Sequence, residues 1–298
     1  KKAPVFGSFA DLSKTYGDAA FSSAATVSNS ISGSFSYSSS NTAVATIASD
    51  GVVTIIKAGT TVIQATFTPS DGSINAVGTA YRTLTVGKKA QATAQADYFG
   101  QAIDYGSTFT FSGTNVVRIA SGYSTGLTPI YSIVSGNCAI SGDKMTATSI
   151  GTCVVKGTIP GGDNYLDSSA NGTITVLKVY LDFAPVNSQF TYGQNIDPAY
   201  GITGLKGTDS VLSVVKTYSG TNSTVYGPST TTPSDVGTYR VDFSNLILAN
   251  SKNSNYTIRY SSSYAALTIT KGAQLALTIN QTSATVLSPL TLTTSGGS

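Results

Sequence analysis

The stretch GTTVIQATF at residues 59–67 returns in altered form as GTCVVKGTI at residues 151–159 and as GTYRVDF at residues 237–243. In each copy one set of alternate side chains is mainly apolar and the other is mainly polar. Side chains of a β-strand point alternately to the two faces of a sheet, so the pattern indicates a strand with one buried face. A slip of one residue would bury Arg240 and Asp242, so the pattern also predicts the register. The predicted inward positions are Thr61, Ile63, Ala65, Phe67, Cys153, Val155, Gly157, Ile159, Tyr239, Val241 and Phe243.

Two further landmarks accompany each copy of this strand. A Tyr-Gly pair precedes it, and glycine suits a turn that requires a positive φ angle. A short alternating strand follows it and is itself followed by lysine, which marks the end of one repeat. The pairs are Tyr16-Gly17, Tyr105-Gly106 and Tyr192-Gly193, and the closing strands carry Leu84 and Val86, Ile174 and Val176, and Leu267 and Ile269.

The landmarks divide the 298 residues into repeats of about 90 residues each, a length typical of small two-sheet sandwiches. Short strands separated by Gly, Asn and Ser turns favour an all-β fold without a helix of consequence. We therefore predict tandem β-sandwich modules at residues 1–87, 88–178 and 179–271, arranged in a rod-like array. Residues 272–298 are too few for a sandwich, and we expect them to begin an incomplete fourth module.

The composition excludes several classes of partner. Only 10% of residues are charged, the 14 acidic residues are all Asp, and the net charge of +3 comes from dispersed lysines and arginines. No basic stripe could follow a phosphate backbone, so we expect no nucleic-acid partner. No apolar run reaches the roughly 18 residues of a membrane span, and no signal segment opens the sequence. Any export signal or anchor is expected to lie outside this segment.

The first module carries the motifs of a known family. SSSNTAVATI at residues 38–47, DGVVT at 50–54, AGT at 58–60 and IQAT at 63–66 closely resemble the group 2 bacterial immunoglobulin-like family. The motifs keep the order and spacing of that family over roughly half of the module. The resemblance implies stalk modules of intimin-like and invasin-like adhesins, other long surface proteins and some phage tail proteins, and it implies no catalytic residues.

The other two modules resemble related repeat types. CAISG at residues 138–142 and ATSIGTC at 147–153 look like a disulfide-bearing immunoglobulin-like variant of repetitive bacterial surface proteins. DVGTY at 235–239, NYTI at 255–258 and LTITK at 267–271 are similar to the mostly bacterial immunoglobulin-like (MBG) repeat family. Both resemblances imply an extracellular protein on a bacterial surface.

Cys138 and Cys153 are the only cysteines of the chain and flank a predicted hairpin within one module. Two paired strands could bring them within bonding distance, so we expect a disulfide and an oxidising compartment. The alternatives are a buried thiol pair in a cytosolic protein and a two-cysteine zinc site. The zinc site is disfavoured because the chain contains no histidine to complete it.

The remaining candidate residues have structural interpretations. Asp235, Gly237 and Tyr239 fit the D-x-G-x-Y pattern of a tyrosine corner, in which the phenol bonds to nearby backbone. The aspartates lack the grouping of a calcium loop, so we expect no metal and no cofactor. The 17 tyrosines could form sugar-stacking platforms, but most are better interpreted as core and turn residues. Without histidine there is no conventional nucleophile and base pair, so we expect no catalytic residues and no enzyme.

Three functional hypotheses follow. The first is a non-catalytic stalk segment of a repetitive adhesin on the bacterial cell surface, whose ligand binds through domains outside this segment. The second is a subunit of a self-assembling filament or surface layer, with self-association through residues 272–298. The third is a carbohydrate-binding or receptor-binding module, including that of a phage tail fibre. Repeats without loop insertions favour the first hypothesis.

Overall fold

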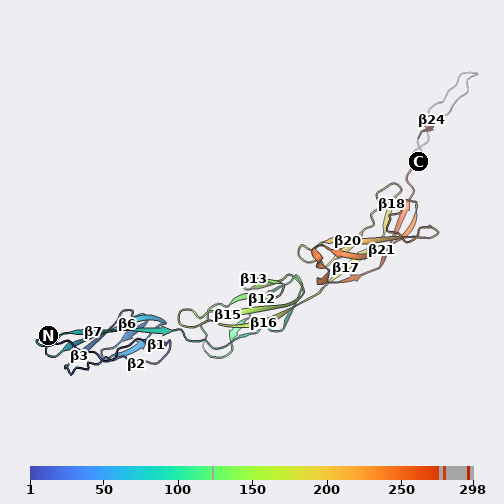
Figure 1. Ribbon diagram of the computed structural model, residues 1–298. Helices are drawn as coiled ribbons and strands as arrows, with labels where there is room; N and C mark the ends of the chain where they lie inside the picture. Colours follow the sequence, from blue (N-terminus) through green and yellow to red (C-terminus); the bar gives the residue numbers. More distant parts are fainter. Residues whose placement is uncertain (123, 275–277, 280–293, 296–298) are drawn as a thin grey trace, which may run out of the picture. The chain divides into compact units, whose positions relative to one another are not determined.

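The computed structural model describes residues 1–122, 124–274, 278–279 and 294–295. The fold is all-β, and the one helix among the described residues is the 3₁₀ helix η1 (Ala249–Asn255). Strands β1 to β23 follow one another along the chain and are joined by turns, by longer loops and by η1 (Figure 1). The absence of Glu and the abundance of Thr, Val, Ile and Tyr favour this content, because branched and aromatic side chains fit a pleated surface.

The first sandwich is built by strands β1 to β7. One sheet has the order β1-β7-β6-β3, in which β1 is parallel to β7 and the other neighbours are antiparallel. The facing sheet has the order β2-β5-β4. The strands are β1 (Leu12–Thr15), β2 (Phe21–Ser22), β3 (Gly33–Ser39), β4 (Ala45–Ile47), β5 (Val52–Ile55), β6 (Gly59–Pro69) and β7 (Gly78–Gly87).

The second sandwich is built by strands β8 to β16. Its largest sheet has the order β12-β15-β16-β9, and two smaller sheets have the orders β10-β14-β13 and β11-β8. The strands are β8 (Ala94–Ala96), β9 (Gln101–Asp104), β10 (Thr108–Thr110), β11 (Val117–Ile119), β12 (Ile130–Ser135), β13 (Cys138–Ser141), β14 (Lys144–Ala147), β15 (Gly151–Ile159) and β16 (Ser168–Leu177).

The third sandwich is built by strands β17 to β23. Its sheets have the orders β18-β23-β21-β20 and β19-β17-β22, with parallel pairs β18 with β23 and β17 with β22. The strands are β17 (Val179–Pro185), β18 (Ser188–Thr191), β19 (Tyr200–Thr203), β20 (Val211–Thr221), β21 (Gly237–Leu248), β22 (Tyr256–Tyr260) and β23 (Tyr264–Thr270).

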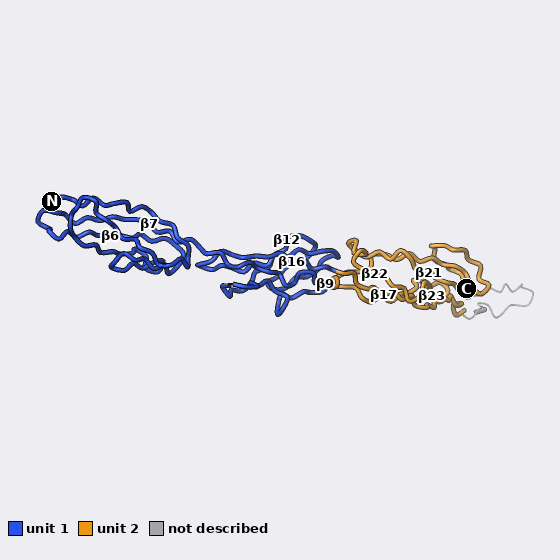
Figure 2. The backbone as a smooth tube through the Cα atoms, turned by 90° about the horizontal axis from the view of Figure 1, so that it is seen from below, with its two compact units in different colours: residues 1–103, 107–176 blue, residues 104–106, 177–298 orange. Residues whose placement is uncertain are grey.

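The chain forms two compact units, which Figure 2 distinguishes by colour. The first comprises residues 1–103 and 107–176, and the second comprises residues 104–106 and 177–298. The first two sandwiches therefore fall almost wholly in one unit. The short segment Asp104–Gly106 belongs with the second unit although it precedes most of the second sandwich. The module boundaries proposed from the sequence stay a prediction.

The predicted inward faces are confirmed by burial. Ile63, Ala65, Val155 and Val241 are fully buried, and the other predicted inward positions of β6, β15 and β21 are also buried. Their sheet neighbours Leu84, Ile174 and Leu267 are equally inaccessible. The polar positions between them face outward or lie at intermediate depth. Alternation alone thus gave the right register in all three copies.

Gly157 interrupts an otherwise bulky inward face because the Val117 side chain and the Tyr98 hydroxyl occupy the space beside it. The Tyr98 ring is fully buried and its hydroxyl donates to the Val155 carbonyl oxygen at 3.1 Å. A Cβ on Gly157 would lie 2.6 Å from Val117 Cβ, and one on Gly172 would lie 2.4 Å from the Tyr98 ring. Burial raises the pKa of Tyr98 to about 12, since a phenolate would lose its hydration there.

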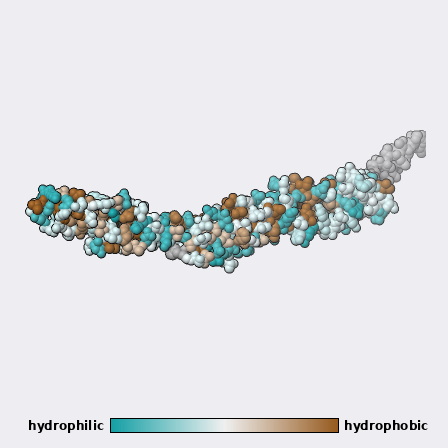
Figure 3. Space-filling view, turned by 60° about the horizontal axis from the view of Figure 1, so that its bottom comes forward, coloured by the Kyte–Doolittle hydropathy of each residue, from teal (hydrophilic) through white to brown (hydrophobic). Residues whose placement is uncertain are grey.

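The segment after the third sandwich contains the two-residue strands β24 (Thr278–Ile279) and β25 (Thr294–Ser295), which pair antiparallel. The start of a fourth module predicted for residues 272–298, with Leu275, Leu277 and Leu290 among its inward side chains, lies largely outside the described residues. On the face that Figure 3 shows, apolar residues form small patches separated by polar ones. No helix among the described residues is long and apolar enough to cross a membrane.

Candidate functional site: the Tyr-Gly turns

The three Tyr-Gly landmarks form equivalent turns. Each tyrosine N–H donates to the carbonyl oxygen of the residue that precedes the closing lysine of its repeat, and each glycine has a positive φ between 74° and 87°. The turns therefore lie where the last strand of each sandwich ends. The hydrogen bonds join Tyr16 to Gly87 at 2.9 Å, Tyr105 to Leu177 at 2.9 Å and Tyr192 to Thr270 at 2.8 Å.

The first turn packs against the second sandwich within the first unit. The Tyr16 ring meets the Tyr165 ring edge to face, with centroids 5.5 Å apart. Gly17 lies beside Lys89, where an added Cβ would be 3.4 Å from the lysine Nζ. Edge-to-face tyrosine pairs contribute about 0.5–1.5 kcal/mol beyond the area they bury. Sequence reasoning treated Tyr16 as a turn residue and missed this contact.

The loop at residues 161–167 of the second sandwich also binds the first sandwich through polar groups. The Ala58 N–H donates to Asn164 Oδ1 at 3.0 Å, and Lys57 Nζ lies 2.8 Å from Asp163 Oδ2. This ion pair lowers the pKa of Asp163. Both charged side chains are exposed to solvent, so the ion pair contributes little to stability.

The same loop is held to the chain that enters the second sandwich. The Lys89 N–H donates to the Asn164 carbonyl oxygen at 2.9 Å, and the Leu166 N–H donates to the Lys89 carbonyl oxygen at 2.8 Å. Lys88 Nζ donates to the Gly162 carbonyl oxygen at 2.7 Å. The junction between the first two sandwiches thus combines backbone pairing, one amide contact and one ring contact.

The second turn is more deeply buried. Tyr105 is 5% exposed, and its ring meets the Tyr256 ring edge to face at 5.6 Å. Both hydroxyls donate to Asp209 Oδ2, at 2.9 Å from Tyr105 and 2.7 Å from Tyr256. The Lys206 N–H donates to the Tyr256 hydroxyl at 2.9 Å. Burial, together with the neighbouring carboxylate, raises the pKa of both tyrosines.

The third turn differs from the other two. Tyr192 is 57% exposed, and no aromatic ring among the described residues packs against it. A Cβ on Gly193 would meet no described atom within 4 Å. Tyr192 borders two shallow surface hollows, one lined by residues 193–196 and 232–234 and the other by Val236, Lys271, Gly272 and Gln274.

The cysteines form a disulfide, and the Tyr239 hydroxyl bonds to nearby backbone as in a tyrosine corner. Cys138 in β13 and Cys153 in β15 form a disulfide, with Cα atoms 6.3 Å apart, and the Cys153 side chain is buried. The Tyr239 hydroxyl donates to the Asp235 carbonyl oxygen at 2.7 Å. Gly237 lies beside that ring, because an added Cβ would be 3.2 Å from the Tyr239 hydroxyl. None of these residues lies at a Tyr-Gly turn.

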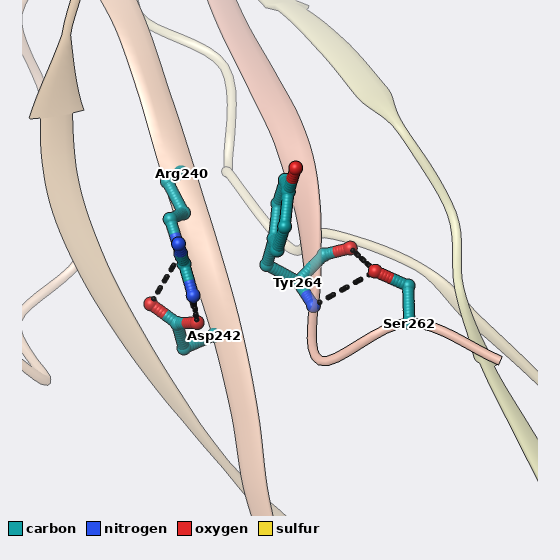
Figure 4. A network of polar contacts seen from close by, with 4 residues as sticks. All are labelled: Arg240, Asp242, Ser262 and Tyr264. Carbon is teal, nitrogen blue, oxygen red and sulfur yellow. Dashed lines mark hydrogen bonds and ion pairs between the residues drawn. The ribbon is translucent and has the colours of Figure 1, made fainter. Parts of the chain in front are cut away.

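Two exposed tyrosines are covered by arginines. The Arg240 guanidinium lies 4.2 Å from the Tyr264 ring centroid and is held there by Asp242 on the same strand (Figure 4). Arg259 lies at the same distance over Tyr180 and bonds to Asp182. These rings are stacked by cations of the chain itself, so the faces under the arginines are not open sugar platforms. No group of three or more metal-ligating side chains occurs among the described residues.

Comparison with known proteins places one family match in the first sandwich. Residues 20–68 match the model of the intimin immunoglobulin-like domain. That range runs from β2 to β6 and contains the motifs that resemble the group 2 bacterial family. No curated protein matches the chain.

Several solved structures of tandem extracellular domains are similar to the chain at low identity. The immunoglobulin domains 1–5 of Sidekick-1 match with 11% identity and a TM-score of 0.41, over 90% of this chain and 59% of that one. Mouse cadherin-23 EC22–24 matches with 13% identity and a TM-score of 0.30, over 91% of this chain and all of that one. Drosophila N-cadherin EC1–3 matches with 13% identity and a TM-score of 0.34, over 89% of this chain and all of that one. The chain thus spans less than two thirds of the Sidekick-1 structure.

Proposed function

We propose that the chain is a non-catalytic stalk segment of an adhesin on the bacterial cell surface. In this role its modules hold a ligand-binding domain, encoded elsewhere in the protein, away from the cell. The match of the first sandwich to an intimin immunoglobulin-like domain supports the adhesin class.

The observation that carries the proposal is the junction between the first two sandwiches. The second sandwich contacts the first through the Tyr16 and Tyr165 rings, the Ala58 amide and the Lys57 ion pair. Several contacts at different points around one joint restrict both bending and twisting, whereas a bare linker would restrict neither. A stalk requires such joints, because a chain of loosely tethered modules would collapse toward the surface.

The carbohydrate-binding hypothesis has less support. A sugar site needs an open aromatic face with convergent polar groups, but Tyr264 and Tyr180 carry arginines on their rings. The Tyr192 ring is exposed, but the equivalent tyrosines of the other two turns, Tyr16 and Tyr105, pack against tyrosine rings of the chain. We therefore expect the 298-residue chain to give no saturable signal on a glycan array.

A bead-capture assay tests the stalk function. The chain is fixed to bacteria through a heterologous anchor at its C-terminus and carries a streptavidin-binding peptide at Lys1. We expect capture of streptavidin beads across a surface polymer layer by the full chain and markedly weaker capture after deletion of residues 88–178. Without the polymer layer, the two chains should capture beads equally.

Three results would contradict the proposal. They are equal capture by both chains across the polymer layer, saturable glycan binding by the chain itself, and ordered filaments of the purified chain in the electron microscope. The last result would favour the filament subunit instead.

A further inference from the structure

The partners of the first two Tyr-Gly turns share a short sequence. Tyr16 packs against the tyrosine of Asn164-Tyr165, and Tyr105 packs against the tyrosine of Asn255-Tyr256. The two centroid distances, 5.5 Å and 5.6 Å, and the edge-to-face geometry agree closely. An Asn-Tyr pair after a loop is therefore the element that receives a Tyr-Gly turn.

Both receiving tyrosines are placed by the same backbone arrangement. Tyr165 pairs in parallel with Lys89, and Tyr256 pairs in parallel with Val179. Each of these pairing residues stands one position after the lysine that closes the preceding repeat, Lys88 or Lys178. The corresponding position in the third repeat is Gly272, directly after Lys271. The third repeat thus has a lysine and a following residue, Lys271 and Gly272, at the positions that pair with the receiving loop in the first two repeats.

The surface around the third turn is open in the part of the chain that the structure describes. Gly17 and Gly106 lie beside Lys89 and Lys206, but Gly193 has no described neighbour within 4 Å of an added Cβ. Lys271 corresponds to Lys88, whose ammonium binds a loop carbonyl of the second sandwich. The exposed ring, the open glycine and the lysine are the features that the first junction uses.

We propose that Tyr192, Gly193 and Gly272 form a docking surface for an immunoglobulin-like module that follows Lys271 and presents the tyrosine of an Asn-Tyr loop. This inference rests on the proposed stalk function and gives it a specific joint. The Tyr192 ring packs edge to face on the incoming tyrosine, and Gly272 pairs with it in parallel. Lys271 donates to a carbonyl of the same loop.

The first sandwich of a second molecule does not present this element. Its loop pairs Asn75 in parallel with Lys2, at the position that Tyr165 occupies in the second sandwich. An asparagine amide offers no ring to Tyr192. The Asn-Tyr pairs of the second and third sandwiches are already in contact with Tyr16 and Tyr105. The occupant is therefore a following module with its own Asn-Tyr loop.

Tryptophan fluorescence tests the proposal, because the chain contains no tryptophan. Tyr192→Trp is placed in the 298-residue chain and in two extended chains. In the extended chains residue 270 is followed by a second copy of residues 88–178 or of residues 178–271, so that Lys88 or Lys178 stands at the position of Lys271 and Asn164-Tyr165 or Asn255-Tyr256 becomes available. Tyr16→Trp in the unmodified chain gives the reference for an occupied turn, and amide NMR spectra verify that each added copy is folded.

We expect the indole to be open to acrylamide in the 298-residue chain and protected to the level of the Tyr16→Trp reference in the extended chains. Tyr165→Ala or Tyr256→Ala, made in the added copy alone, should restore quenching. An indole that stays open beside both folded copies would overturn the proposal. Protection in the 298-residue chain that grows with protein concentration would also overturn it, because a second molecule would then be the occupant. Since quenching does not depend on bead capture, failure of the docking surface and failure of the stalk function are distinguishable.

Discussion

The Tyr16 and Tyr105 turns have the same backbone hydrogen bond and the same positive φ at glycine, but the side chains around the two tyrosine rings differ. Tyr16 lies at intermediate depth, and the adjacent ion pair of Lys57 and Asp163 is largely exposed. Tyr105 is 5% exposed, and its hydroxyl shares one carboxylate oxygen of Asp209 with Tyr256. Salt screens exposed charges strongly and buried hydrogen bonds weakly. The turn therefore sets where a contact is made, while the neighbouring side chains set its strength.

We expect the largest loss of stability from removing the disulfide. This bond lies in the first unit, and the second unit contains no cysteine. A bond that closes a loop of this length contributes about 3 kcal/mol in the loop-entropy model. The double variant Cys138→Ala, Cys153→Ala should therefore lower the urea midpoint of the second sandwich and leave that of the third unchanged. Amide NMR signals of each sandwich report the two midpoints.

Mass spectrometry provides the control for the disulfide. The denatured, unreduced chain should weigh about two daltons less than the reduced chain, since bond formation removes two hydrogens. Neither cysteine should react with an alkylating reagent before reduction. Free alkylation of both thiols in exported protein would contradict the bond and the oxidising compartment.

The next largest loss of stability is expected from replacing Asp209. This carboxylate accepts hydrogen bonds at the buried Tyr105 turn. Asp209→Ala leaves the Tyr105 and Tyr256 hydroxyls without their acceptor, and a buried group left unsatisfied costs about 1–3 kcal/mol. We expect the third sandwich to lose about 2 kcal/mol of unfolding free energy in urea. Asp104→Ala, at an exposed position of the same unit, is the matched control and should change it by less than about 0.5 kcal/mol. Equal effects of the two variants would show that the shared carboxylate is not a stabilising contact.

A smaller effect concerns the ring pair of the first turn. In a double-mutant cycle of Tyr16→Ala and Tyr165→Ala, we expect a coupling of about 1 kcal/mol, typical of edge-to-face aromatic pairs. The coupling should persist in high salt, because it does not depend on the ion pair of Lys57. Strict additivity of the two substitutions would mean that the rings do not stabilise the junction.

No effect is expected from calcium at either turn. Asp163 is paired with Lys57, and Asp209 accepts two phenol hydrogens, so neither carboxylate is arranged with others as a cation ligand set. Thermal unfolding should be the same in calcium and in chelator. A calcium-dependent rise in Tm of more than a few degrees would reveal a cation site at a junction.

Much of the fold could be predicted from the sequence because it depends on local alternation. The inward faces of β6, β15 and β21 followed from period-two patterning, and positive φ at Gly17, Gly106 and Gly193 followed from the turn chemistry of glycine. Tyr98 could not be predicted as the ring that fills the space at Gly172. Its partners are far away in the sequence, and no local pattern indicates which large side chain packs beside a glycine.

The contacts between the first two sandwiches could not be predicted for a similar reason. Tyr16, Asn164 and Tyr165 come from distant parts of the chain, and only the folded structure brings them together. One signal was present in the sequence, since the Asn-Tyr pair recurs at residues 164–165 and 255–256. A motif search that compared loops as well as strands would have found it. Asp209 carries no such signal, because a single aspartate between glycine-rich turns resembles any solvated turn residue.

The most direct test of the central claim, that the Tyr16-Gly17 turn fastens the first sandwich to the second, is residual dipolar coupling of amides in the 298-residue chain. Couplings measured in residues 12–87 and 94–177 report whether the first two sandwiches move as one body. We predict that both sets fit a single alignment tensor in the natural chain and require two tensors in the variant Tyr16→Ala, Asn164→Ala. Two tensors of different magnitude in the natural chain would contradict the claim, because the sandwiches would then reorient independently despite the contacts at Tyr16.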